Sequence, residues 1–271
     1  MSTIREKLIN SIPDQLKPTA RTWYDGLRRL PETPAAYFHP WRLESIKRLR
    51  TYKDIHRGKR CFIIGNGPSL NQLDLTLLKN EYTFGMNRIY MAFPEMGYKT
   101  SYYVCMNDLV VEQCASDIQK MGIPRFLSWR ARKWVNLDND IQFIYTTYTG
   151  PGFSTDIAGR VWESATVTYV SLQLAYYMGF ETVYLIGVDH NFITQGTPNT
   201  TVISQGNDPN HFNPGYFGKG FRWQLPDLET SEIGYRMARE AFQHDGRQVL
   251  DATFGGKLTV FSKVNYTDLF K

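Results

Sequence analysis

The stretch from residue 161 to residue 188 constrains the fold of this chain more than any other part of its sequence. Between Val161 and Met178, apolar residues recur at the spacing of one helix face, and Gly179 stands where such a helix usually ends. Residues 182–188 are then nearly all apolar, as expected for a central parallel strand covered on both faces. A helix followed closely by such a strand is half of a βαβ unit. The sequence therefore predicts an α/β fold with a mostly parallel sheet.

Short apolar runs predict the rest of this sheet. Residues 61–64 are apolar and pass into Gly65-Asn66-Gly67-Pro68, which predicts a buried strand followed by a tight loop. A helix is expected from Ser69, with its leucines on one buried face. Another helix is expected over residues 227–244. Further strands are expected at 82–86, 101–106, 125–128, 141–145 and 248–250, and an edge element at 258–261.

Composition divides the chain into two parts. Residues 1–58 are expected to form an extension that is rich in basic residues and punctuated by prolines, and residues 59–271 are expected to form the α/β domain. Within this domain, residues 190–226 are rich in Asn, Gly, Pro and aromatic residues. Irregular segments of this length in a compact domain usually serve a function, so we expect a lid.

The positive charge is concentrated near the N-terminus. Residues 1–60 hold 14 Lys and Arg against 6 Asp and Glu, whereas the whole chain holds 31 against 26. Such asymmetry is typical of a surface that meets an anionic membrane or an acidic partner, and no nucleic-acid-binding motif accompanies it. A solvated helix face is the alternative. No apolar run resembles a membrane span or a signal peptide. We expect a cytoplasmic protein whose residues 1–60 meet the inner face of the membrane. A homo-oligomer is compatible with the sequence. Arg130, Arg132 and Lys133 are expected in a solvated turn.

Polar residues follow the predicted strands at the points where they end. They are Asn66 after the first strand, Asn87 after the second, Asn107 and Asp108 after the third, and Asp189 and His190 after the central one. Each residue alone is an ordinary turn residue. Ligands of open parallel sheets bind outside the carboxyl ends of the strands, so these side chains are expected to meet in one crevice.

The loop Gly65-Asn66-Gly67-Pro68-Ser69-Leu70 is expected to bind phosphate. Its glycines permit close approach of the backbone to a ligand, and backbone N–H groups at the start of a helix favour an anion. The loop lacks the Lys of a Walker motif and the third glycine of a dinucleotide fingerprint. A plain turn between a strand and a helix is the alternative.

Three strings carry a family resemblance: residues 64–70 (IGNGPSL), residues 86–88 (MNR) and residues 185–189 (LIGVD) after a long helix. Together they resemble the family that joins bacterial CMP-sialic-acid-dependent sialyltransferases, motility accessory factor glycosyltransferases and archaeal-type 6-hydroxymethylpterin pyrophosphokinases. The similarity covers about residues 60–261. It implies a Rossmann-like fold of the glycosyltransferase A-like kind, with helices on both faces of the sheet.

The resemblance implies roles for individual residues. It places Asn66, Asn87 and Asn107 on the nucleotide and its phosphate. It also places Thr166 in the same pocket, with Gly187 and Asp189 beneath the ribose. The chain departs from the sialyltransferase pattern at two points: Asn191 and Thr197 stand where that pattern has tyrosines that hold the leaving phosphate, and Asp227 stands where it has the catalytic histidine.

The lid offers substitutes for these groups. A sugar transferase needs a base for the acceptor hydroxyl, and His211 or Asp227 is a candidate for that role. Tyr216 is a candidate donor to the departing phosphate. The alternative is that His211 and Tyr216 only pack the lid. His190 beside Asp189 has no third ligand at a recognisable spacing, so no metal site is expected.

The leading hypothesis is a glycosyltransferase that transfers a sugar from a nucleotide, CMP being one candidate, to a surface glycan or glycolipid. It needs no cofactor. The first alternative is an ATP-dependent 6-hydroxymethylpterin pyrophosphokinase in which Asp108 and Asp189 hold magnesium. The second is a nucleotide-binding module without catalysis.

Overall fold

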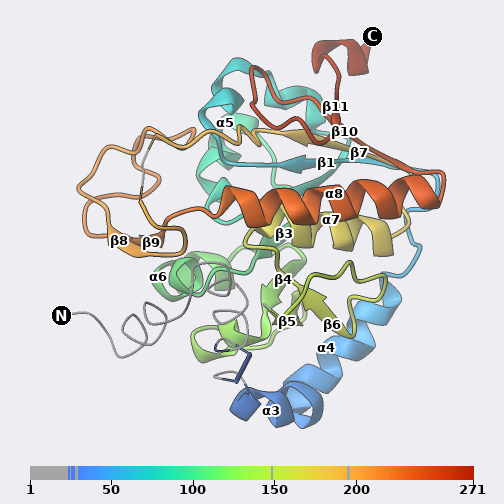
Figure 1. Cartoon of the computed structure of the whole chain (residues 1–271), viewed down its shortest axis with the longest axis vertical. Helices are drawn as coiled ribbons and strands as arrows, with labels where there is room; N and C mark the ends of the chain where they lie inside the picture. The colour runs from blue at the N-terminus through green and yellow to red at the C-terminus, as the bar shows by residue number, and fades with distance from the viewer. Residues whose placement is uncertain (1–23, 25, 28–29, 148, 194–195) are drawn as a thin grey trace, which may run out of the picture.

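The computed structural model describes residues 24, 26–27, 30–147, 149–193 and 196–271. In this part of the chain, nine strands form one parallel sheet in the order β11-β10-β7-β1-β2-β3-β4-β5-β6 (Figure 1). The strands are β1 (Arg60–Ile64), β2 (Tyr82–Met86), β3 (Tyr102–Cys105), β4 (Arg125–Ser128), β5 (Ile141–Thr147), β6 (Arg160–Trp162), β7 (Thr182–Ile186), β10 (Gln248–Asp251) and β11 (Ser262–Lys263). The predicted α/β class is confirmed, because every pairing within the sheet is parallel.

The centre of the sheet is buried on both faces, which is why its strands are continuous apolar runs. β1 pairs with β7 on one side and with β2 on the other. Cys61 and Ile63 join the core on one face, and Phe62 and Ile64 join the core on the opposite face. Alternate side chains of a strand point to opposite faces, so a strand in this position needs an apolar residue at each place.

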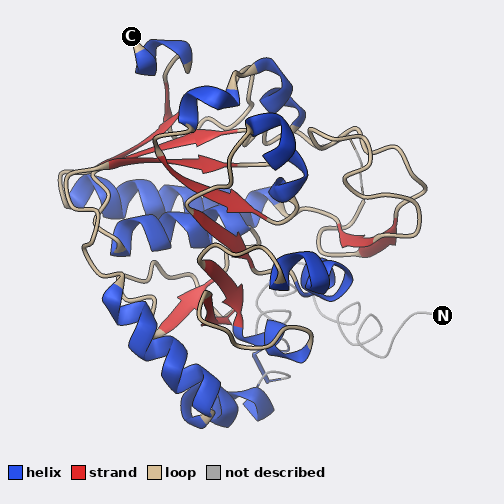
Figure 2. Cartoon of the chain, turned by 180° about the vertical axis from the view of Figure 1, so that it is seen from behind, coloured by secondary structure: helices blue, strands red, loops and turns tan. Residues whose placement is uncertain are grey.

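Helices cover both faces of the sheet, as the sequence predicts. Helices α7 (Val167–Tyr177) and α8 (Leu228–His244) lie side by side across one face (Figure 1). Helices α5 (Phe93–Met96) and α6 (Asp108–Gln119) contribute to the core of the other face, with short 3-10 turns between the strands (Figure 2). These turns are η3 (Pro68–Gln72), η4 (Leu75–Leu78), η5 (Ile89–Ala92) and η6 (Trp129–Lys133). No helix among the described residues combines the length and the apolar character that crossing a bilayer would require.

The predicted helix from residue 161 begins later than its apolar pattern indicates. The residues before it form strand β6, which pairs with β5 at the edge of the sheet. Ser164 and Ala165 then adopt left-handed backbone angles, with φ of 47° and 55°, which cannot continue a right-handed helix. Thr166 caps α7 by accepting a hydrogen bond from the Thr168 N–H.

Two other predicted elements are wrong. The segment from Ser69 forms the separate 3-10 turns η3 and η4 in place of one helix, because Asp74 caps a new turn by accepting from the Thr76 N–H. Leu77 is consequently 41% exposed. The edge strand at the C-terminal end is β11, whereas residues 258–261 lie just before it without strand pairing.

Part of the predicted N-terminal extension packs against the sheet. Helices α3 (Thr33–Phe38) and α4 (Pro40–Thr51) follow the turn η2 (Leu30–Glu32), and α4 lies against β5. Leu49 is fully buried, and the Ser45 hydroxyl accepts a hydrogen bond from the Phe143 N–H at 3.0 Å. Arg42 donates to the carbonyl oxygen of Ala158 at 2.6 Å. Residues from α3 onward therefore belong to the same packed body as the sheet, while residues 1–23 lie outside the described residues.

Residues 190–226 extend beyond the carboxyl ends of the strands, as a lid would. They include an antiparallel pair, β8 (Thr201–Ile203) with β9 (Arg222–Gln224) (Figure 1). Gln113 of α6 bonds both to the N–H and to the carbonyl oxygen of Arg222, each at 2.8 Å. Ten residues earlier in the segment, the Phe212 N–H donates to the Asn66 carbonyl oxygen at 2.9 Å. The described part of this lid is thus tied both to α6 and to the loop after β1.

Candidate functional site

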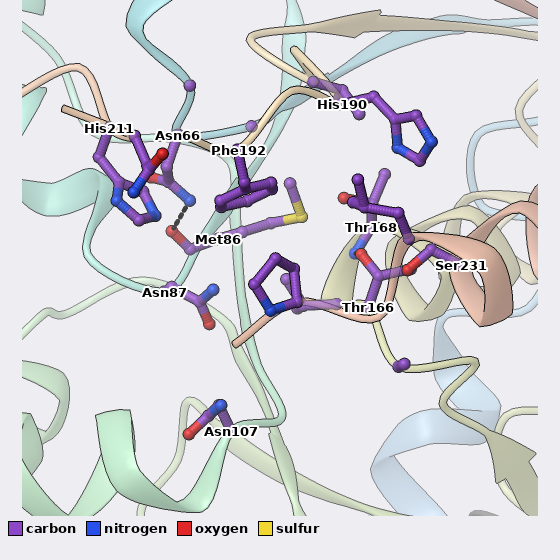
Figure 3. Close-up of a pocket in the computed structure, with 18 of the residues that line it drawn as sticks. Asn66, Met86, Asn87, Asn107, Thr166, Thr168, His190, Phe192, His211 and Ser231 are labelled. Atoms are coloured by element: carbon purple, nitrogen blue, oxygen red, sulfur yellow. Dashed lines mark hydrogen bonds between the residues drawn. The ribbon is translucent and has the colours of Figure 1, made fainter. Parts of the chain in front are cut away.

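A cavity of about 240 Å³ opens where the carboxyl ends of the central strands meet the lid and the start of α7 (Figure 3). It brings together most of the predicted site residues, namely Gly65, Asn66, Gly67, Asn87, Asn107, Thr166, Gly187, Asp189, His190 and His211. Four predicted site residues do not line it: Ser69, Asp108, Tyr216 and Asp227. The expected meeting of strand-end side chains in one crevice is therefore observed for Asn66, Asn87, Asn107, Asp189 and His190, and not for Asp108. Which of them bind a nucleotide stays a prediction.

At the cavity, the side-chain nitrogen of Asn66 is hydrogen-bonded, whereas its side-chain oxygen has no donor among the described residues. Its Nδ2 donates to the Met86 carbonyl oxygen at 3.1 Å, which fixes the orientation of the amide. Its Oδ1 is buried, and no described residue donates a hydrogen bond to it. A buried acceptor without a donor costs about 1–3 kcal/mol. A ligand that supplied a donor at this position would recover that energy.

Asn87 and Asn107 are held in place by the ends of their strands. Asn87 adopts a left-handed backbone with φ of 50°, and its carbonyl oxygen accepts from the Tyr103 hydroxyl at 2.6 Å. The Asn107 Oδ1 caps α6 by accepting from the Leu109 N–H at 2.9 Å. The Asn107 Nδ2 lies 3.4 Å from Gln224 Oε1 of the lid. The Asn107 oxygen is thus committed to the helix, and the amide nitrogen is the atom that faces a partner.

The glycines of the loop after β1 are required by its contact with the turn that follows β7. A Cβ at Gly65 would overlap the carbonyl oxygen of Gly187, and a Cβ at Gly67 would overlap the carboxylate of Asp189. The Gly65 N–H donates to Ile186 O at 2.7 Å, and the Gly67 N–H donates to Gly187 O at 2.9 Å. Contact between two protein segments therefore accounts for both glycines before any ligand is considered.

Ser69 completes this contact. Its N–H donates to Asp189 Oδ1 at 3.1 Å, and its hydroxyl donates to Asp189 Oδ2 at 2.7 Å. The turn η3 is only five residues long and of the 3-10 kind. The Gly65, Gly67 and Ser69 N–H groups thus already have acceptors within the protein, and phosphate binding by this loop stays a prediction. Burial raises the pKa of Asp189 above its ordinary value, while the hydrogen bonds from Ser69 oppose the rise.

Asp108 belongs to a buried ion-pair network beside the cavity. The Arg130 Nε lies 2.9 Å from both carboxylate oxygens of Asp108, and the Arg130 Nη2 donates to Glu163 Oε1 at 2.8 Å. Arg130 and Glu163 are both buried, and Glu163 lines the cavity. The expected solvated turn at Arg130 is therefore wrong. The turn η6 carries this guanidinium into the core, where the carboxylates of Asp108 and Glu163 compensate its charge.

His211 has the geometry of an oriented base. Its Nδ1 lies 2.8 Å from Asp208 Oδ2, and a carboxylate can only accept, so the ring donates from Nδ1. Its Nε2 is then the unprotonated nitrogen of the neutral ring. The ring stacks on Tyr216, with centroids 4.0 Å apart and planes 5° apart. Asp208 is itself buried. Asp208 is not among the residues that the sequence predicts for the site, although an acidic residue three positions before a histidine is a signal for such a pair.

Tyr216 and Asp227 do not occupy the places that their predicted roles require. Tyr216 is fully buried, and its hydroxyl accepts from the Arg88 N–H at 3.1 Å. Burial also raises the pKa of this hydroxyl well above its usual range. Asp227 caps α8, accepting from the Thr230 N–H at 3.0 Å and from Asn199 Nδ2 at 3.1 Å. Tyr216 thus supports the His211 ring, and both carboxylate oxygens of Asp227 are occupied.

A second histidine lies across the cavity from His211. In Figure 3, His211 and Asn66 lie on one side of Phe192, and His190 lies on the other side with Thr168 and Ser231. The His190 Nε2 is 3.0 Å from Glu232 Oε1, and this hydrogen bond lowers the pKa of Glu232. The described residues hold no group of three or more His, Cys, Asp or Glu arranged to bind a metal ion.

The departures from the sialyltransferase pattern also have definite positions. Asn191 lines the cavity, whereas Thr197 does not. In that pattern, tyrosines hold the leaving phosphate. In this chain, other side chains would have to make those contacts.

Comparisons with known proteins identify a family. A family model described as 6-hydroxymethylpterin diphosphokinase MptE-like matches residues 41–195, which is more than half of the chain. The match begins at residue 41, within α4, whereas the similarity was expected to begin at about residue 60. Comparison with curated protein sequences gives no significant match. A solved structure of a Maf glycosyltransferase from Magnetospirillum magneticum AMB-1 is 15% identical, with a TM-score of 0.47, and the match covers 83% of this chain and 38% of that one. The chain thus spans well under half of that protein.

Proposed function

This chain belongs to the MptE-like family, and from the side chains of its cavity we propose that it is a glycosyltransferase with a nucleotide-activated sugar as donor. The observation that carries the proposal is His211, whose Nδ1 is held by Asp208 at 2.8 Å while the residue lines a cavity walled by asparagine side chains. Transfer of a sugar to a hydroxyl needs one oriented base and a set of hydrogen-bonding groups for the nucleotide.

The strand-end asparagines supply the nucleotide contacts in this proposal. Asn66, Asn87 and Asn107 reach the cavity from three neighbouring strands. Carboxamides both donate and accept, so they suit the mixed donors and acceptors of a base, a ribose and a phosphate. The Asn66 Oδ1, which lacks a donor among the described residues, would accept from an amino or hydroxyl group of the donor substrate.

The reaction follows from these positions. His211 Nε2 takes the proton of the acceptor hydroxyl, and the acceptor oxygen forms a bond to the anomeric carbon of the sugar. The bond between that carbon and the phosphate oxygen breaks, and the nucleotide leaves with the electron pair. The acceptor in this proposal is a hydroxyl of a surface glycan or glycolipid.

The family description favours a second candidate, an ATP-dependent diphosphokinase acting on a 6-hydroxymethylpterin. That reaction uses Mg²⁺ to bridge the phosphates of ATP. The two carboxylates predicted to hold the ion fit that role poorly. Asp108 is paired with Arg130, and both oxygens of Asp189 accept hydrogen bonds from Ser69. We therefore place the glycosyltransferase first.

A thermal-shift panel tests nucleotide binding. CMP, CTP, UDP, GDP and ATP are each added with and without Mg²⁺, because a ligand that binds only the folded state stabilises it by about 2.7 kcal/mol at a concentration of 100 Kd. We expect CMP, UDP or GDP to raise the melting temperature without Mg²⁺. Stabilisation by ATP alone, and only with Mg²⁺, would favour the diphosphokinase.

Turnover with the matching nucleotide sugar and a hydroxyl acceptor then tests catalysis. The glycosyltransferase is expected to work in EDTA, since protein groups neutralise the leaving phosphate. Loss of turnover on chelation, with recovery on adding Mg²⁺, would count against it. Nucleotide binding without turnover on any donor would indicate a binding module.

A further inference from the structure

Exposed apolar side chains are concentrated in the N-terminal helices. Six of the thirteen large apolar residues exposed among the described residues lie between residues 24 and 43. Three of them sit together where α3 ends and α4 begins: Tyr37 is 50% exposed, Phe38 is 79% exposed and Leu43 is 50% exposed. We call these three residues the α3–α4 corner. Contiguous exposed apolar surface on a folded domain usually marks an interaction site.

The exposed face of α4 changes from apolar to basic along its length. Pro40, Leu43, Lys47 and Arg50 are all exposed and stand at the spacing of one helix face. The acidic residue of this helix, Glu44, is paired with Arg48 at 2.9 Å. The outward face thus runs from the apolar corner to two cationic side chains roughly one and two turns away.

This arrangement matches the layers of an anionic membrane surface. Apolar side chains enter the boundary between headgroups and acyl chains, and neighbouring lysines and arginines meet the acidic headgroups. The graded apolar-to-basic face of α4 favours the bilayer.

The corner lies near the carboxyl ends of the strands, as the cavity does. The Thr33 hydroxyl of α3 is 3.4 Å from the hydroxyl of Tyr145, near the carboxyl end of β5. Glu32, just before α3, is 3.0 Å from Lys133 in the turn that follows β4. The cavity opens at the carboxyl ends of the central strands of this sheet. The corner and the cavity therefore both lie toward the carboxyl ends of the strands.

We propose that the α3–α4 corner docks on an anionic lipid bilayer, with Tyr37, Phe38 and Leu43 inserted at the interface and Lys47 and Arg50 on acidic headgroups. This binding is independent of the reaction in the cavity.

Sedimentation of the full-length chain with vesicles tests the proposal. The vesicles are phosphatidylglycerol mixed with phosphatidylcholine, or phosphatidylcholine alone. We expect binding to the anionic vesicles to exceed binding to the neutral ones. We expect Phe38→Ser with Leu43→Ser to lower it about tenfold or more, and Lys47→Glu with Arg50→Glu to abolish the preference for anionic lipid. The matched control is Phe254→Ser. Phe254 is 61% exposed and lies after β10, which is near the opposite edge of the sheet from β5.

Every replaced side chain is at the surface, so we expect the variants to remain folded. Unchanged melting temperatures would show this. The proposal is overturned if the wild-type chain does not sediment with anionic vesicles, or if the corner variants bind like the Phe254→Ser control. It is also overturned if the wild-type chain is a dimer in solution that Phe38→Ser makes monomeric without any effect on vesicle binding. The corner would then be an interface between copies of the chain.

Discussion

At His211, one hydrogen bond decides which ring nitrogen is available to a substrate. Asp208 lies 2.8 Å from Nδ1, and the Tyr216 ring stacks behind the imidazole. This arrangement holds the ring and its tautomer before any ligand arrives. The orientation depends on a loop segment that binds through Phe212 to the loop after β1. The candidate base and the candidate nucleotide loop are therefore positioned together.

Replacing this base separates chemistry from binding. We expect His211→Gln to lower kcat by about 10²-fold or more, with little change in nucleotide affinity. Asp208→Asn should lower kcat less, because the imidazole remains but its tautomer is no longer fixed. His244→Gln is the control, since that side chain is 88% exposed at the end of α8. Turnover assays combined with calorimetric titration measure both quantities. Wild-type kcat in His211→Gln would remove His211 from the mechanism.

The asparagines call for two different substitutions. Asn66→Ala removes one amide, whereas Asn87 has a left-handed backbone with φ of 50°, where alanine would be strained. Asn87→Gly removes its side chain without that strain, so an alanine at this position would be a poorer probe. We expect each variant to lose about 1 kcal/mol or more of nucleotide binding. Asn139→Ala, at an exposed position, should bind like the wild-type chain in the same calorimetric titration. Wild-type affinity in both test variants would contradict the proposed site.

At the scale of elements, two strand-end segments hold each other in place. The loop after β1 and the turn after β7 meet through backbone hydrogen bonds and through Asp189, which binds Ser69 twice. Both segments line the cavity. The shape of the site thus depends on close contact between parts of the chain that are far apart in sequence.

Adding one methyl group to this contact tests it. A Cβ at Gly67 would overlap the Asp189 carboxylate, which must then move away from Ser69. We expect Gly67→Ala to destabilise the fold by about 1–3 kcal/mol and to weaken nucleotide binding. Gly152→Ala is the control, because its Cβ would meet nothing within 4 Å. Urea unfolding of the two variants measures the difference. Equal midpoints would show that the Asp189 contact adapts without cost.

On the scale of the whole molecule, α4 makes the N-terminal region a layer of the domain. Its inner face carries Leu49, which is fully buried, and its outer face carries Leu43, which is 50% exposed. A chain shortened to begin near residue 51 would therefore lose packing as well as basic charge. Point substitutions on α4 separate these two effects.

The inner and outer leucines of α4 form a matched pair. We expect Leu49→Ala to lower the free energy of unfolding by about 2–5 kcal/mol, because it leaves a cavity between α4 and the sheet. Leu43→Ala should change it by about 0.5 kcal/mol or less. Denaturant unfolding curves give both values. A small effect of Leu49→Ala would mean that α4 contributes little to the stability of the domain.

The sequence by itself determined the sheet and the direction in which its strand ends point. Central strands such as β1 and β7 are buried on both faces, and this demands uninterrupted apolar runs that can be read locally. Parallel strands end on one side of the sheet, so Asn66, Asn87 and Asn107 had to lie on the same side, and the strand order then made them neighbours. The end of α8 at His244 followed in the same way from local pattern.

Only the tertiary structure decided how the site is assembled. The later start of α7 depends on Ser164 and Ala165, whose left-handed angles no periodicity predicts. The requirement for glycine at residue 67 comes from Asp189, and the burial of Arg130 comes from Asp108 and Glu163. The spacing of apolar residues predicts whether a position is buried. It does not predict which distant residue packs against that position, because that partner is fixed by the packing of the whole chain.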